Sequence, residues 1–135
     1  WTYNNQGVPV QMLKIKNDSD TTRVNFTLTE QGDPGEEKSV HQGVEQPPYY
    51  YYFDKQHRLT DVVRYNVRAK RMLPDYIFEY EKNRMSTMLV VSEGSTDYQK
   101  WYYSYDEEGL KGQDACYSKT QVLIGRVEYK YQYRK

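Results

Sequence analysis

Residues 49–59 read YYYYFDKQHRL, and this stretch decides the fold. In an extended chain its side chains alternate between two faces, so that Tyr49, Tyr51 and Phe53 share one face. A period of two is typical of a half-buried β-strand, and tyrosine and phenylalanine favour the pleated surface of a sheet. The polar residues that follow suit a tight turn. The stretch therefore predicts a strand, a turn and the start of a second strand.

The same pattern recurs along the chain. Residues 77–85 read IFEYEKNRM, residues 101–110 read WYYSYDEEGL, and residues 127–135 read VEYKYQYRK. Each copy contains an aromatic residue, a spacer residue and a second aromatic residue. The second aromatic residues of this motif lie 27, 25 and 26 positions apart: Phe53, Tyr80, Tyr105 and Tyr131. Another 27 positions back lies Phe26, in a segment that also alternates. A constant period indicates one repeated supersecondary unit, so we predict hairpins of about 26 residues.

No window of the sequence has strong helical periodicity. We therefore predict an all-β fold, an antiparallel meander of repeated hairpins that forms a single twisted sheet or a partly open barrel. Residues 1–135 are expected to form one domain, because a chain of this length supports one hydrophobic core. Within it, residues 1–48 are the less regular part, with a long polar loop over 31–46. Residues 49–135, which hold 15 of the 16 tyrosines, form the hairpin repeats.

Composition excludes several classes of function. The 19 basic residues balance the 19 acidic ones, so we expect no nucleic-acid partner. No apolar stretch approaches the length of a transmembrane helix, and the single cysteine, Cys116, allows no intrachain disulfide. The sequence begins with Trp1 and not with Met. From this we expect a mature form whose signal peptide has been removed, and a secreted, periplasmic or cell-surface location.

The sequence contains no recognisable catalytic constellation. Nothing local pairs Cys116 with either histidine as nucleophile and base. Asp54, Glu81 and Asp106 recur at equivalent repeat positions, and a glycosidase would need two such carboxylates across a cleft. The simpler interpretation is that each acidic side chain opens a turn by bonding its own backbone. We therefore predict no catalytic residues, no metal site, no cofactor and no enzymatic activity.

Tyrosines fall on both faces of the predicted sheet. The face that is aromatic in every repeat is the better candidate for the buried side. The opposite face carries Tyr50, Tyr52 and Tyr102 among charged residues. Tyrosine offers contact area at low entropic cost together with a hydroxyl, so these three are candidates for an aromatic platform that binds a sugar ring or a partner protein. The alternative is that they form cross-strand pairs on a solvated face.

Two segments carry a resemblance to a known family. Residues 51–60 read Tyr-x-Phe-Asp-x-x-x-Arg-Leu-Thr, and residues 103–110 read Tyr-x-Tyr-Asp-x-x-Gly-Leu. Residues 49–135 thereby resemble the tyrosine–aspartate repeats of Rhs-type bacterial surface and toxin-associated proteins, whose tandem strands form β-structured shells or sheets. The period here is longer and only three copies are good, so the resemblance does not imply a large shell. The chain also looks like small secreted tyrosine-rich bacterial proteins of unknown function, which implies an extracellular or envelope location and assigns no functional residues.

We therefore expect a non-enzymatic, secreted or envelope-associated module that binds a protein or a glycan through a sheet face or an edge strand. Two alternatives remain open. One is a hydrolase-type enzyme with its site near the loop at 29–48, and the other is a structural spacer built of repeats. A pocket with converging carboxylates or histidines favours the enzyme, whereas an aromatic strip favours the binding module. The sequence makes no prediction about the oligomeric state.

Overall fold

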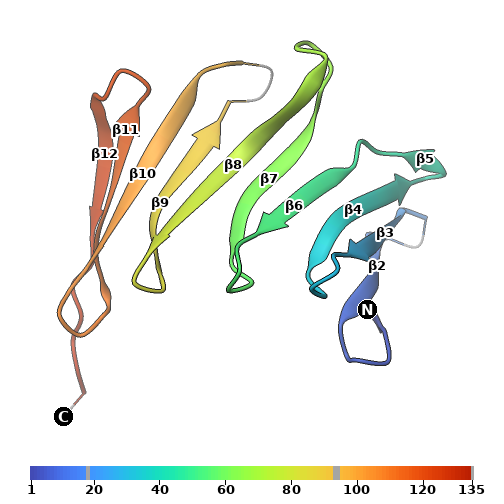
Figure 1. Cartoon of the computed structure of the whole chain (residues 1–135), viewed down its shortest axis with the longest axis horizontal. Coiled ribbons are helices and arrows are strands. Elements are labelled where there is room, and N and C mark those ends of the chain that lie inside the picture. The colour runs from blue at the N-terminus through green and yellow to red at the C-terminus, as the bar shows by residue number, and fades with distance from the viewer. Residues whose placement is uncertain (18, 93–94, 135) are drawn as a thin grey trace. The chain divides into compact units, whose positions relative to one another are not determined.

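The protein is described by a computed structural model that covers residues 1–17, 19–92 and 95–134. The described residues form β-strands joined by turns, with no helix among them (Figure 1). They fall into two compact units, Trp1–Pro74 and Asp75–Lys135. The predicted all-β class is confirmed, and each unit is an antiparallel meander of the predicted kind.

The first unit follows the chain order almost throughout. Its strands are β1 (Thr2–Tyr3), β2 (Pro9–Ile15), β3 (Thr21–Leu28), β4 (Pro34–His41), β5 (Val44–Glu45), β6 (Tyr49–Phe53) and β7 (Leu59–Asn66). The pairing order is β1-β2-β3-β4-β6-β7, and β5 pairs with β4 beside this path. Strand β5 takes the end of β4 at Val40 and His41, whereas β6 takes Glu36 and Glu37. A two-residue strand therefore fills the part of β4 that β6 does not reach.

The second unit is built in the same way. Its strands are β8 (Arg71–Glu81), which begins just before the unit boundary, β9 (Arg84–Val91), β10 (Tyr98–Tyr105), β11 (Lys111–Ser118) and β12 (Leu123–Glu128). Each pairs antiparallel with the next, in the order β8-β9-β10-β11-β12. Since β8 and β12 do not pair with each other, this run of strands is open and not closed into a barrel.

One turn design recurs in both units. The first residue of the turn exchanges two backbone hydrogen bonds with the residues three and four positions later, and its side-chain oxygen accepts a further amide. This happens at Asn4, Thr29, Asp54, Asp106 and Ser118. The fourth residue has a positive φ in each case, which glycine adopts most readily; His57 and Gln121 take this place in two of the turns. The first residues of the first four of these turns are 25, 25 and 52 positions apart. These spacings correspond to one, one and two predicted periods of about 26 residues.

The prediction that acidic residues open turns is confirmed at Asp54 and Asp106. Asp54 accepts the amides of Gln56 and Arg58. Glu81 differs, because it precedes a two-residue turn in which Lys82 and Asn83 both have positive φ. Turns of that type join two strands directly and need no side-chain acceptor.

The long loop predicted over 31–46 is wrong, because this segment contains β4 and β5. Its glycine and charged residues have low β-propensity, which concealed the strand. Pairing with neighbouring strands makes this segment a strand, because β4 is hydrogen-bonded to β3 along its length and to β5 and β6 on the other side. Gly35 belongs in this strand because a Cβ there would lie 2.7 Å from Cγ2 of Thr29. The close approach of Thr29 to the backbone of β4 therefore explains why a glycine, which composition alone would assign to a loop, stands in this strand.

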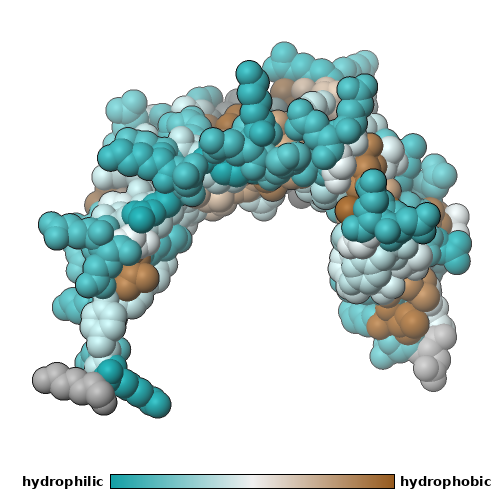
Figure 2. All heavy atoms as spheres, turned by 60° about the horizontal axis from the view of Figure 1, so that its bottom comes forward, coloured by the Kyte–Doolittle hydropathy of each residue, from teal (hydrophilic) through white to brown (hydrophobic). Residues whose placement is uncertain are grey.

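Burial within each unit is modest. The buried apolar side chains of the described residues are Val24 and Val62 in the first unit and Ala115 and Cys116 in the second. All four lie near the middle of their strands, and no described side chain is completely enclosed. Figure 2 shows mostly hydrophilic side chains on the face in view, with smaller hydrophobic patches between them.

The predicted alternation of faces holds on the most aromatic strands. In β10 the side chains of Trp101, Tyr103 and Tyr105 are half-buried, whereas the ring of Tyr102 between them is 45% exposed. In β6, likewise, the side chain of Phe53 is half-buried, whereas that of Tyr52 is 54% exposed. The all-aromatic face is thus better covered than Tyr52 and Tyr102 opposite it, although Tyr50 is half-buried as well. In the fourth copy the prediction is wrong, because the side chains of its aromatic face are all exposed: Val127, Tyr129, Tyr131 and Tyr133.

Candidate functional site

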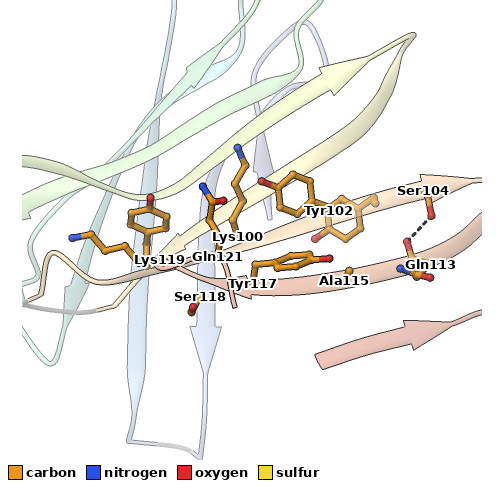
Figure 3. Close-up of a pocket in the computed structure, with 11 residues that line it drawn as sticks. Lys100, Tyr102, Ser104, Gln113, Ala115, Tyr117, Ser118, Lys119 and Gln121 are labelled. Carbon is orange, nitrogen blue, oxygen red and sulfur yellow. Dashed lines mark hydrogen bonds between the residues drawn. The ribbon is translucent and has the colours of Figure 1, made fainter. Parts of the chain in front are cut away.

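A groove of about 600 Å³ lies over β10 and β11 of the second unit (Figure 3). Alternate residues of β10 contribute Tyr98, Lys100 and Tyr102 to one side of it, because side chains two positions apart share a face. The register between the strands sets Tyr117 opposite Lys100 and Ala115 opposite Tyr102. The groove therefore follows directly from strand alternation and register.

The shape of the groove depends on a large and a small residue side by side. The rings of Tyr102 and Tyr117 meet edge to face, with centroids 5.5 Å apart and planes at 88°, an arrangement that aromatic pairs favour. Figure 3 shows the two rings next to each other, with the short side chain of Ala115 beside them. Because Ala115 is small and buried, the space above it stays open between the rings and the polar end of the groove.

The groove is polar at its rim and positively charged. Ser104, Gln113 and Gln121 offer a hydroxyl and two amides, and Lys100 and Lys119 offer ammonium groups. In the part of the chain that the structure describes, no carboxylate or histidine lines the groove. Its surroundings are therefore suited to an anionic or hydroxyl-rich ligand.

The two lysines are held close to tyrosine rings. The Nζ of Lys100 lies 5.3 Å from the ring centroid of Tyr102, and the Nζ of Lys119 lies 5.8 Å from that of Tyr98. Lys100 is also 3.9 Å from an oxygen of Glu79, and Lys119 donates a hydrogen bond to the carbonyl of Thr96. An ammonium has three donors, so each lysine keeps donors for a ligand.

A second groove, of about 440 Å³, lies in the first unit. It contains Tyr50 and Tyr52 of β6 together with Glu30 and Asp33 of the turn between β3 and β4. The three tyrosines predicted to bind a ligand thus line two grooves: Tyr50 and Tyr52 line this one, and Tyr102 lines the groove of the second unit. The groove of the first unit is acidic, whereas the groove of the second unit is basic.

Sequence reasoning missed part of the groove in the second unit. Tyr98 shares its face with Tyr102 and was open to prediction from the alternation in β10. Tyr117 and Lys119 were not, because their place beside β10 depends on the register between β10 and β11 and on the turn after β11. The spacing within one strand does not specify that register.

The opposite face of the second unit carries a compact polar cluster. Asp114, whose side chain is largely buried, accepts hydrogen bonds through Oδ2 from the hydroxyl of Tyr129 (2.7 Å) and from Lys111 Nζ (3.2 Å). The ammonium of Lys111 lies 4.2 Å from the ring centroid of Tyr103. The hydrogen bond to Asp114 raises the pKa of Tyr129, and burial raises the pKa of Tyr103. This cluster fastens the segment after β12 to the sheet.

Cys116 has no catalytic setting. Its side chain is buried in the middle of β11, and burial raises the pKa of the thiol. A nucleophilic cysteine needs a lowered pKa and access to substrate. Cys116 therefore acts as a small apolar residue of the sheet.

Two comparisons with known proteins, by family model and by sequence, give no match. No protein-family model matches the sequence, and a search of curated proteins gives no significant match. Among the described residues there is no helix long and apolar enough to span a membrane. The described side chains likewise include no cluster of three or more histidine, cysteine or acidic residues placed to hold a metal ion.

Proposed function

We propose that the chain is a non-enzymatic, secreted or envelope-associated binding module, and that its ligand is an acidic glycan held in the groove over β10 and β11. The observation that carries the proposal is the pair of rings of Tyr102 and Tyr117 beside Lys100, in a groove that no acidic side chain of the described residues lines. Sugar rings have an apolar face that packs on aromatic rings and a rim of hydroxyls that needs polar partners.

The remaining features of the groove agree with such a ligand. Its volume lies within the roughly 300–1,000 Å³ of typical small-molecule sites. Gln113 and Gln121 provide both donors and acceptors for sugar hydroxyls. The ammonium groups of Lys100 and Lys119 are suited to the carboxylates of a uronic acid, because charge-assisted hydrogen bonds are stronger than neutral ones.

The proposal is tested by titrating the protein with a tetrasaccharide of galacturonic acid and with a neutral glucose tetrasaccharide, using calorimetry. We expect binding of the acidic probe and weaker or no binding of the neutral one. Replacing Tyr102 by alanine removes a ring contact worth about 1–2 kcal/mol, which weakens binding about tenfold. Lys100→Gln is expected to reduce the preference for the acidic probe.

Tyr52→Ala is the matched control, because it removes an exposed tyrosine from the other unit. Binding by this variant should equal that of the wild type. If the Tyr102→Ala variant binds the acidic probe as tightly as the wild type, the proposed site is wrong. If neither probe binds the wild type, the proposed ligand class is wrong.

One observation favours a second candidate function, a hydrolase site in the segment 29–48. Glu30 and Asp33 line the groove of the first unit, and Asp33 Oδ2 lies 2.8 Å from Nδ1 of His57. A carboxylate that orients a histidine is one half of many hydrolytic sites. The test is an assay with chromogenic glycosides and esters. Turnover that Asp33→Asn abolishes would support the hydrolase, and its absence would leave the groove without a catalytic role.

A further inference from the structure

The outer edge of β12 is open. This strand is the last of its run, and no described strand pairs with its second side. The amide of Tyr129 donates to the carbonyl of Gly112 on β11. Because amides alternate in direction along a strand, those of Gly125 and Val127 also point to β11, whereas those of Arg126 and Glu128 point outward. The edge thus offers a row of hydrogen-bonding groups to another strand.

The side chains on this edge are partly apolar and exposed. Leu123 and Ile124 are exposed, and Val127 is 45% exposed. Arg126 and Glu128 flank Val127, with side chains 54% and 55% exposed, and they lie 3.5 Å apart as an ion pair within the chain. A natural edge strand is normally protected by charges that repel a partner. Here the two charges have opposite sign, so they do not protect the edge against a copy of itself.

We propose that β12 pairs antiparallel with β12 of a second copy of this chain, in the register that places Val127 opposite Val127 of the other copy. A two-fold pairing must place outward-facing residues opposite outward-facing residues. Centred on Val127, it sets Arg126 of each copy opposite Glu128 of the other, which gives two ion pairs. Opposite charges directly across a sheet stabilise the pairing, and like charges destabilise it.

The two neighbouring registers are disfavoured by charge. Centring the pair on Arg126 brings the two arginines together, and centring it on Glu128 brings the two glutamates together. Charge therefore favours the register centred on Val127 over these two neighbours.

The apolar contacts agree with the same register. Val127 would face its own copy in a pair without direct hydrogen bonds, where side chains approach most closely. Gly125 would lie opposite Tyr129 of the other copy. A Cβ on Gly125 would meet nothing within 4 Å, so there is open space for the tyrosine ring. Aromatic residues across from a glycine on an edge strand cover the exposed backbone in this way.

The test is a charge exchange measured by sedimentation equilibrium over a range of protein concentrations. The wild type is expected to dimerise. Glu128→Arg places Arg126 opposite an arginine, and Arg126→Glu places Glu128 opposite a glutamate, so each single variant should weaken the dimer at least about tenfold. Mixing the two single variants restores both ion pairs and should yield a heterodimer. The double variant R126E/E128R should dimerise like the wild type.

Glu107→Arg, in the turn between β10 and β11, makes the same change of charge away from the edge and should leave the dimer unaffected. Circular dichroism confirms that each variant keeps its β-structure. A monomeric wild type would overturn the proposal, and it is the result expected if the edge instead receives a strand of a different protein. Single variants that dimerise like the wild type, or a mixture that does not associate, would also overturn it.

Discussion

At the scale of single residues, the side chains that open turns carry the repeat. Asp54 is the clearest case. Burial acts to raise its pKa, but hydrogen bonds from the amides of Arg58 and Gln56 and the nearby guanidinium of Arg58 outweigh burial and lower the pKa. The carboxylate is therefore part of the turn, which explains why Asp54 and Asp106 occupy equivalent places in their hairpins.

This lowered pKa predicts a dependence of stability on pH. The native state favours the charged form of Asp54, so the contribution is complete above the ordinary carboxyl pKa and is lost as the pH falls through the lowered pKa. We expect Asp54→Asn to flatten the acid limb of a plot of unfolding free energy against pH, measured with urea. An acid limb identical to that of the wild type would show that Asp54 does not contribute.

A second prediction concerns Asp106, which accepts the amides of Glu108 and Leu110. Replacing it by alanine should lower the free energy of unfolding by about 1–2 kcal/mol, because both amides lose their acceptor. Asp106→Asn keeps an acceptor oxygen and should remain close to the wild type. Equal losses in the two variants, measured by urea denaturation, would show that the turn does not depend on this acceptor.

At the scale of strands and hairpins, the sequence predicts elements well where alternation is strong. Strands β6, β9, β10 and β11 lie where the aromatic pattern or the residues after each turn place them. Strand β4 was missed because charged residues and a glycine hide a strand that its neighbours stabilise on both sides. The groove was predicted in part, through Tyr102, whereas Tyr117 depends on a register that only the paired strands define.

The segment after β12 provides a prediction at this scale. Tyr129 donates to the buried carboxylate of Asp114, and Tyr131 donates to the carbonyl of Lys111. Tyr129→Phe leaves that Asp114 oxygen with Lys111 alone, so we expect the free energy of unfolding to fall by about 1–2 kcal/mol. Tyr131→Phe, which loses a bond to an exposed group, should cost less. Chemical denaturation distinguishes the two, and a larger loss for Tyr131→Phe would contradict the role of Asp114.

At the scale of the whole molecule, two units of one design each rest on few buried side chains. The strands that contain these buried side chains are expected to be the most stable parts of each unit. Amide hydrogen exchange should therefore be slowest in β3 and β11, which contain Val24, Ala115 and Cys116 and are paired on both sides. Exchange should be fastest in the two-residue strands β1 and β5. Uniform protection along the chain, measured by mass spectrometry, would contradict this distribution.

The two grooves differ in charge although they occur in units of the same design. The groove in the first unit is lined by Glu30 and Asp33, and the groove in the second unit by Lys100 and Lys119. Variation at turns and at alternate strand positions changes the groove without changing the sheet. An acidic ligand should therefore discriminate between the units.

The most direct test of the account is an NMR titration of the whole protein with the galacturonic acid tetrasaccharide. We predict chemical-shift changes at Tyr98, Lys100, Tyr102, Ala115, Tyr117 and Lys119, and none at Tyr50 or Tyr52. Shifts confined to the groove of the first unit, or no shifts at saturating ligand, would contradict the assignment of an acidic-glycan site to β10 and β11.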